Sequence, residues 1–119
     1  MKISNDKPPK NARRVYSWAD LPECQSPGTY LTEGHDKESH KIVVDKKRQR
    51  VLEGLIRSPL YAASYVRLSD HVDHLKRAGM DIETLMFRND PETGRDTYGI
   101  YVLRSRVTRI DGQLNEVAA

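Results

Sequence analysis

A short amphipathic segment that ends in glycine and is followed at once by two apolar strands constrains this fold more than any other feature. Leu68, Val72 and Leu75 recur at i, i+4 and i+7, so they form one apolar stripe along a helix. Gly79 comes directly after the segment and supplies the left-handed residue that often follows a helix. The pattern predicts a helix over residues 66–78.

A β-hairpin is predicted directly after this helix. Residues 82–87 and 98–103 alternate between the two sides of a strand and carry large apolar side chains on both sides. The segment 89–94 between them holds Asn, Asp, Pro and Gly, which are typical of turns. We therefore expect a hairpin with Arg88 and Arg95 flanking its tip.

Because both sides of the hairpin are apolar, one side should pack on the helices and the other should be covered by another part of the chain. The best candidate is the N-terminal third, where Val15–Trp18 and Tyr30–Thr32 combine aromatic and aliphatic side chains. Apart from these runs, residues 1–40 contain few periodic apolar positions and several Pro and Gly residues. They are expected to form a flexible basic arm over residues 1–12 and an irregular extension packed on the domain.

A further helix is predicted upstream. Residues 41–44 have the pattern of a short strand, and Asp45 can cap a helix over residues 46–57. The buried side of that helix is expected to hold Val51, Leu52, Leu55 and Ile56.

Positive charge is concentrated at the start of this helix, where it opposes the helix dipole and cannot serve to stabilise the helix. The residues concerned are Lys46, Lys47, Arg48 and Arg50. A nucleic-acid phosphate backbone would explain them, although a basic helix end that only faces water is common. The net charge of the chain is only +3, so the electrostatic signal lies in how the charges are grouped.

Length and composition indicate a single domain. The chain has 119 residues, enough for one hydrophobic core but not for two. With 37% hydrophobic and 31% charged residues it should be well solvated. We expect residues 41–110 to form the folded domain and 111–119 a flexible tail. No stretch is apolar enough to span a membrane and no signal peptide is evident, which predicts a cytoplasmic protein without a membrane partner.

Residues that could carry catalysis or hold a cofactor are scarce. Cys24 is the only cysteine, so an internal disulfide and a cysteine-based zinc site are excluded. His71 and His74 could share a helix face and bind a divalent metal, but they converge poorly and no further ligand is evident. A phosphate-binding glycine loop and a nucleophile elbow are both missing. The sequence therefore predicts no enzyme, no catalytic residue, no metal site and no cofactor.

Two runs, Arg67–Thr84 and Tyr98–Leu103, carry a resemblance to a known family. They resemble the recognition helix and wing strands of small winged helix-turn-helix proteins of phages and prophages, and with the basic first helix the likeness covers residues 41–106. The resemblance implies an α+β winged helix-turn-helix fold with a wing over residues 82–103. It also implies a phage or mobile-element transcription regulator that binds double-stranded DNA. One departure matters, because Ser58–Tyr65 leaves room only for one helical turn or a short strand where the family has a second helix.

If the helix over residues 66–78 enters the major groove, its outward side chains would read the bases. Arginine can bond guanine or phosphate, histidine can donate, and a carboxylate can accept from a cytosine amino group. The wing and the N-terminal arm would contact the backbone or the minor groove. The predicted DNA-binding residues are Arg67, Asp70, Asp73, His74 and Arg77 of this helix, Lys46, Lys47 and Arg48 of the preceding helix, Arg88 and Arg95 of the wing, and Lys10, Arg13 and Arg14 of the arm.

A different class of function stays open, namely a phage-encoded interaction module that inhibits a host enzyme or defence complex through the same scaffold. Asp70 and Asp73 would repel phosphate, which favours a protein partner. They could instead be neutralised by i, i+4 pairing with His74 and Arg77. A palindromic DNA site would fit a homodimer, which the sequence neither requires nor excludes.

Overall fold

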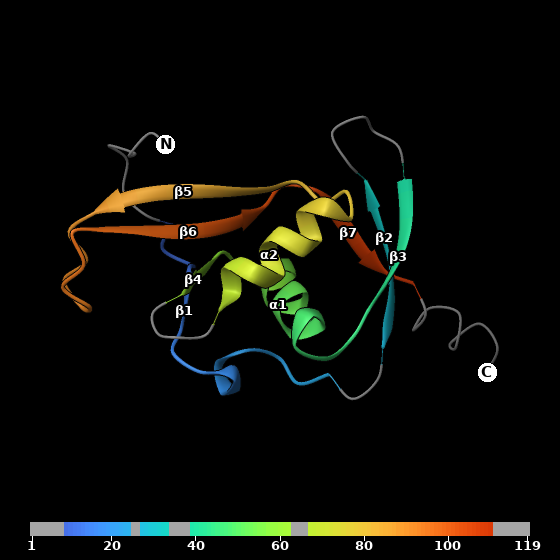
Figure 1. The fold of residues 1–119 in the computed structure, drawn as a ribbon, viewed down its shortest axis with the longest axis horizontal. Coiled ribbons are helices and arrows are strands. Elements are labelled where there is room, and N and C mark those ends of the chain that lie inside the picture. Colours follow the sequence, from blue (N-terminus) through green and yellow to red (C-terminus); the bar gives the residue numbers. More distant parts are fainter. Residues whose placement is uncertain (1–8, 25–26, 34–38, 63–66, 111–119) are drawn as a thin grey trace.

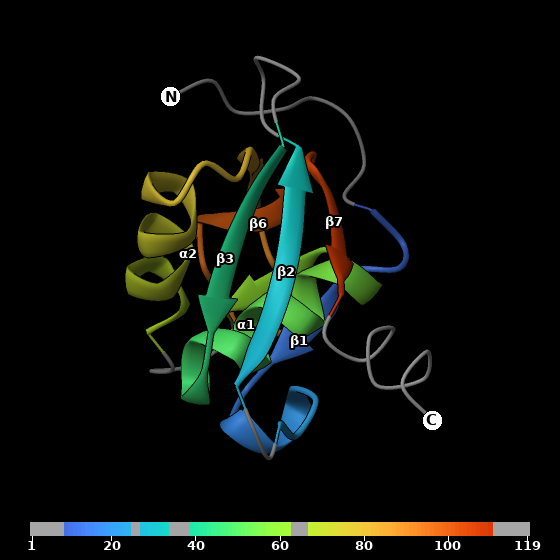
Figure 2. The ribbon, with the colours of Figure 1, turned by 90° about the vertical axis from the view of Figure 1, so that its right-hand side faces the viewer.

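The computed structural model describes residues 9–24, 27–33, 39–62 and 67–110. In Figure 1 two helices lie between a four-stranded and a three-stranded sheet, and Figure 2 views the three-stranded sheet face-on. This mixed arrangement confirms the expected α+β class. In chain order the elements are β1 (Arg13–Val15), the 3-10 helix η1 (Trp18–Asp20), β2 (Gly28–Glu33), β3 (Ser39–Val44), α1 (Lys46–Arg57), β4 (Leu60–Ala62), α2 (Leu68–Arg77), β5 (Ile82–Arg88), β6 (Thr97–Leu103) and β7 (Arg106–Arg109).

Both sheets are assembled from segments far apart in the sequence. The four-stranded sheet has the order β1-β4-β6-β5, with β1 parallel to β4 and the other neighbours antiparallel. In the three-stranded sheet β2 lies between β3 and β7 and is antiparallel to both.

A bend carries the chain from β6 into β7. Asp81 holds this bend, because its carbonyl accepts from the Arg104 amide at 2.8 Å and its amide donates to Ser105 Oγ at 2.7 Å.

The predicted hairpin is confirmed, and its register runs from Ile82 opposite Leu103 to Arg88 opposite Thr97. Of the two possibilities left open after α1, the short strand is confirmed over the three residues of β4, which pairs with β6. The helix predicted over residues 66–78 begins later, at Leu68, because Arg67 holds the non-helical N-cap position. Residues 63–66 lie outside the described residues.

One hydrophobic core joins both sheets and both helices. On α1 the predicted stripe is buried except at Ile56, which lies at its edge in the last turn and is 39% exposed. Burying a side chain of this size contributes about 1.5–3 kcal/mol, so the shared core dominates the stability of the layers. Its members are Val15, Leu21, Tyr30, Val44, Val51, Leu52, Leu55, Leu60, Leu68, Val72, Leu75, Met80 and Ile82.

A smaller, mostly aromatic cluster covers the opposite side of the four-stranded sheet. Tyr61, Phe87, Tyr98 and Ile100 are buried there, and Ala12 packs against them. The rings of Tyr61 and Tyr98 stack with 5.1 Å between their centroids. The hairpin therefore has buried side chains on both sides, Ile82 on one and Phe87, Tyr98 and Ile100 on the other.

The N-terminal third has more regular secondary structure than the sequence predicts. The residues by which it covers the aromatic cluster also differ from the expected ones. The described part forms β1, η1 and β2 instead of an irregular extension. Side chains alternate along β1, so Val15 enters the main core while the Arg14 guanidinium lies 4.6 Å from the Tyr61 ring centroid on the other side. Tyr30 belongs to the other sheet. The expectation that Val15 and Tyr30 cover the aromatic cluster is therefore wrong, and Ala12 and Arg14 lie there in their place.

The end of α2 has the predicted glycine cap. The Met80 amide donates to the Leu75 carbonyl at 3.1 Å and the Gly79 amide donates to the Lys76 carbonyl at 3.0 Å, which are the two bonds of a Schellman motif. Gly79 has a φ of 106°, a conformation that glycine adopts without strain. Met80 and Leu75 both enter the core, so this cap also sets the direction of the chain into β5.

Replacing Gly79 with alanine should lower the free energy of unfolding by about 1–2 kcal/mol, because a Cβ is strained at this φ. The nearest atom to an added Cβ is His40 Cδ2 at 3.7 Å, so the loss comes from the backbone and not from a clash. Gly79→Asn should lose less, since asparagine adopts left-handed conformations more readily. Urea unfolding measures both variants, and equal losses would contradict this explanation.

Candidate nucleic-acid interface

Three cationic side chains project from the first turn of α1. Lys46 and Lys47 are exposed, Arg48 is partly buried, and within the described residues no carboxylate forms an ion pair with any of them. Asp45 holds the predicted N-cap position, but its side chain makes no capping hydrogen bond. The turn therefore combines uncapped N–H groups with uncompensated positive charge, an arrangement that an anion would stabilise.

The backbone is strained at the same point. Lys46 has a φ of 55°, in the left-handed region that side chains with a Cβ rarely adopt. Asp45 is the one residue between the end of β3 and the start of α1, so the chain must reverse abruptly there. Strain of this kind costs about 1–3 kcal/mol and persists where the surrounding structure imposes it.

A pocket of about 380 Å³ opens between this turn and the first turn of α2. Asp45, Lys46, Lys47 and Arg48 line it from the α1 side, and His71 lines it from α2. Arg48 Nε and His71 Nδ1 are buried and have no hydrogen-bond partner in the part of the chain that the structure describes. Leaving such a group unsatisfied costs about 1–3 kcal/mol.

Trp18 of η1 forms one wall of this cluster. Lys47 Nζ lies 5.1 Å from its ring centroid, and the His71 ring meets it edge-on at 5.6 Å. Arg50 holds the segment in place by donating to the carbonyl oxygens of Trp18 at 2.5 Å and Pro22 at 3.1 Å. Lys47 is thus presented against an aromatic surface that Arg50 holds in place.

The pKa of His71 is lowered from its ordinary value, first because burial disfavours the charged ring and second because Arg48 is close. Lys47 and His74 act in the same direction, and Asp70 opposes them. His71 is therefore neutral at pH 7, and its Nδ1 can donate or accept according to the ligand.

The outward face of α2 carries the predicted base-reading residues, but its charges are paired with one another. Arg67 bonds Asp70 at 3.1 Å and Arg77 bonds Asp73 at 2.8 Å, with all four side chains more than half exposed. The Asp73–Arg77 pair is confirmed, whereas Asp70 pairs with Arg67 instead of His74, because Arg67 reaches one turn forward from the N-cap. Exposed pairs contribute about 0–1 kcal/mol, so a ligand can open them at little cost.

The wing presents one available arginine and one that is used internally. Arg88 ends β5, is exposed, and makes no hydrogen bond or ion pair within the described ranges. Arg95 donates to the Ala62 carbonyl at 3.0 Å, and its guanidinium lies 5.9 Å from the Tyr61 ring centroid. Arg95 therefore ties the wing to β4.

Arg14, expected on a flexible DNA-contacting arm, is instead a structural residue. Its guanidinium makes hydrogen bonds of 2.8 and 3.0 Å to Asp90, whose side chain is fully buried. Tyr61 and Thr93 also donate to Asp90. The Arg14 hydrogen bonds hold the pKa of Asp90 well below its ordinary value, and those from Thr93 and Tyr61 add to this against the cost of burial. The network joins β1 to the turn at the tip of the wing, 76 positions away in sequence.

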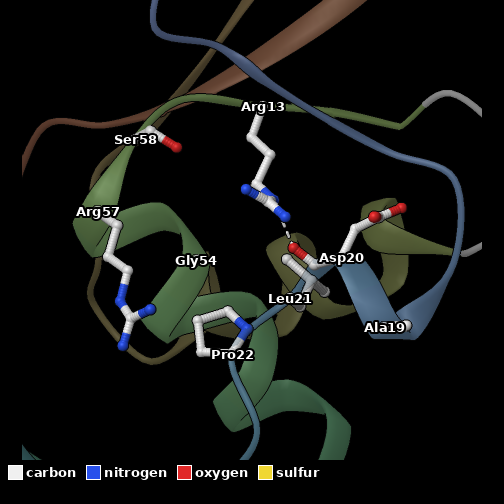
Figure 3. Close-up of a pocket in the computed structure, with 8 residues that line it drawn as sticks. All are labelled: Arg13, Ala19, Asp20, Leu21, Pro22, Gly54, Arg57 and Ser58. Atoms are coloured by element: carbon white, nitrogen blue, oxygen red, sulfur yellow. Dashed lines mark hydrogen bonds between the residues drawn. The ribbon is translucent and has the colours of Figure 1, made fainter.

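The other two arm residues differ from each other. Lys10 is exposed in the turn that precedes β1. Arg13 begins β1, and its Nε donates to the Asp20 carbonyl oxygen at 2.5 Å (Figure 3). Arg13 lines a separate pocket with residues from the C-terminal end of α1, so it does not join the cluster at the start of that helix.

Sequence reasoning missed two parts of this surface. It did not place His71 with the cations of α1, although His71 borders the apolar stripe of α2, where a side chain meets a neighbouring helix. It also missed the Arg14–Asp90 pair, for which a separation of 76 positions leaves no local signal.

No protein-family model, curated protein or solved structure matches this chain. Across residues 9–24, 27–33, 39–62 and 67–110, no helix is long and apolar enough to cross a membrane. In the same residues, no three or more His, Cys, Asp or Glu side chains gather so that they could hold a metal ion.

Replacing Asp90 with asparagine should lower the free energy of unfolding by about 3 kcal/mol, because the Arg14 guanidinium loses its charged partner. The folded-state pKa of Asp90 lies below the unfolded value, so the carboxylate stabilises the fold above about pH 4, and this contribution is lost as the pH falls further. Urea unfolding at neutral and acidic pH measures both effects. Glu92→Gln, which removes the exposed partner of Arg14, is the control and should cost less than about 1 kcal/mol. Similar losses in the two variants would contradict the role given to Asp90.

An oxyanion bound in the α1–α2 pocket should raise the pKa of His71, because its negative charge offsets that of Arg48 and Lys47. NMR titration of the ring, with and without a saturating DNA duplex, measures the change, and we expect the pKa to be higher in the complex. An unchanged His71 pKa in the complex would place the bound phosphate elsewhere.

Proposed function

We propose that this protein binds double-stranded DNA through the start of α1 and the exposed face of α2. The observation that carries the proposal is the pocket that Lys46, Lys47 and Arg48 line together with His71, where these three cations outnumber the one lining carboxylate, Asp45. Two buried polar atoms there, Arg48 Nε and His71 Nδ1, lack a partner among the described residues. Phosphate fits this chemistry because it supplies negative charge and several acceptor oxygens together. A nucleic-acid backbone presents such groups in succession along a surface.

The order of the elements supports a winged helix-turn-helix interpretation. α1, β4, α2, β5 and β6 follow one another in sequence, and β6 lies between β4 and β5 in the sheet. A winged helix has this succession with one further helix before the recognition helix, which the described residues of this chain do not show. Its short first strand pairs with the second strand of the wing, and its recognition helix comes directly before the wing. On this interpretation α2 is the recognition helix and the β5–β6 hairpin is the wing.

On this proposal the start of α1, the outward face of α2 and the wing each make a different kind of contact with DNA. Phosphates held at the start of α1 would orient the protein on the duplex independently of base sequence. His74 and Arg77 would reach base edges once the ion pair with Asp73 opens. Arg88 would contact the backbone from the wing. A role in phage or mobile-element transcription is what the sequence resemblance adds to this proposal. A cytoplasmic location is the expectation from the sequence, which has no apolar membrane span and no evident signal peptide.

A protein partner is the second candidate, and the charge pairing on α2 favours it. Asp70 and Asp73 are each bonded to an arginine, so this face has little net charge to attract a phosphate backbone. Arg14 and Arg95, two of the cations assigned to DNA from the sequence, make internal contacts instead. A partner with mixed charge would suit such a face better than DNA does.

Fluorescence anisotropy with labelled duplexes at two salt concentrations tests the proposal. The wild-type protein should bind, and its Kd should rise steeply with salt. Lys47→Gln should weaken binding to all duplexes alike and lower the salt slope by about one. Arg77→Ala should cost about 1–3 kcal/mol on a selected target sequence and much less on random DNA.

Two further variants sharpen this experiment. Arg106→Gln removes an exposed charge on β7, which lies across the three-stranded sheet from α2 (Figure 2), and it should leave the Kd unchanged. Lys46→Gly removes one charge of the cluster and relieves a positive φ, so it should weaken DNA binding without a loss of stability. Equal effects of Lys47→Gln and Arg106→Gln would reject the α1 cluster as the phosphate site. Failure of the wild-type protein to bind at low salt would reject DNA as the partner and favour a protein.

A further inference from the structure

We propose a second anion site, for a small phosphate or carboxylate compound, in the pocket at the C-terminal end of α1. This pocket measures about 230 Å³ and lies between η1, the residues that follow it and the last turn of α1 (Figure 3). Arg13 of β1 and Arg57 of α1 line it from two sides. The proposal goes beyond DNA binding and does not depend on it.

Neither arginine has a carboxylate partner within the described residues. Arg13 uses Nε on the Asp20 carbonyl oxygen, which leaves its two terminal nitrogens free to donate. The Arg57 side chain makes no hydrogen bond or ion pair with the described residues. The Asp20 carboxylate points away from Arg57 (Figure 3) and accepts from the amides of Tyr16 at 2.9 Å and Ser17 at 3.1 Å. Two guanidinium groups at one pocket without a neutralising acid favour an oxyanion, which can accept from both forks.

The walls of this pocket are held in place by contacts within the protein. Leu21 packs so closely on α1 that a Cβ added to Gly54 would come within 2.8 Å of Leu21 Cδ2. Arg50 donates to the carbonyl oxygens of Leu21 at 3.3 Å and Pro22 at 3.1 Å. Because these walls are formed in advance, less ordering entropy is lost on binding.

The size and lining of the pocket set the ligand class. Its volume lies below the range of about 300–1,000 Å³ that is usual for drug-sized ligands. Ala19, Leu21 and Pro22 supply an apolar part of the lining. The fitting ligand is therefore a single oxyanion group with at most a short apolar part.

The position of the pocket separates it from the proposed DNA surface. α1 has 12 residues, so its two ends are about 18 Å apart. An anion at the C-terminal end would fasten the start of β1 to the last turn of α1, and it would leave the basic cluster at the start of the helix open.

An NMR titration with inorganic phosphate at constant ionic strength tests the proposal. The amide signals of Gly54 and Ser58 should shift and saturate. In Arg57→Gln the Kd read from these signals should rise about tenfold or more, whereas Arg57→Lys should keep part of the affinity because the charge remains. Arg57 is exposed at the helix end, so both variants should fold. Arg106→Gln is the matched control and should bind phosphate like the wild-type protein.

The site of the shifts separates this proposal from DNA binding. If only the amide signals of Lys46, Lys47 and Arg48 shift and saturate, the proposed anion site at the C-terminal end of α1 is rejected. The DNA proposal is not affected by that result. Shifts at Gly54 and Ser58 that do not saturate, or that are the same in Arg57→Gln, would also overturn it. Loss of DNA binding in the anisotropy experiment would leave the result at Gly54 and Ser58 unaffected. A parallel titration with succinate distinguishes a carboxylate ligand from a phosphate.

Discussion

Burial of both helices between two sheets is the constraint on which the rest of this structure depends. α1 contributes Val51, Leu52 and Leu55 to a core that also receives side chains from each sheet. Each such side chain contributes about 1.5–3 kcal/mol when it leaves water, far more than any exposed ion pair on α2. These contacts fix the position of α1 in the core. They therefore also fix where the two ends of α1 reach the surface.

The polar features of the molecule follow from where those ends emerge. At its start, α1 meets α2 and carries cations that work against the helix dipole. At its other end, Arg57 and Arg13 line a separate pocket. Both ends have more positive charge than the described acids compensate, which is the common basis of the two anion sites proposed above.

The elements that the sequence predicts correctly are mostly those with a local pattern. Periodicity and turn chemistry predict a feature when it depends on residues that are close in sequence. This holds for the stripe of Leu68, Val72 and Leu75, for the cap at Gly79 and for the alternation along the β5–β6 hairpin. The parallel pairing of β1 with β4 and the strand β7 were not predicted. They depend on pairing between distant segments, which no local pattern specifies.

The residues themselves establish an α+β chain, the boundaries of its main helices and hairpin to within a few positions, and the grouping of positive charge. They do not establish which of those charges is available to a ligand. Arg14 and Lys47 both belong to basic runs of the sequence. Arg14 forms an ion pair with the buried Asp90, whereas Lys47 has no acidic partner among the described residues. The physical reason is that a charge is neutralised by whatever group folding brings within a few ångströms, and for Arg14 that group lies 76 positions away.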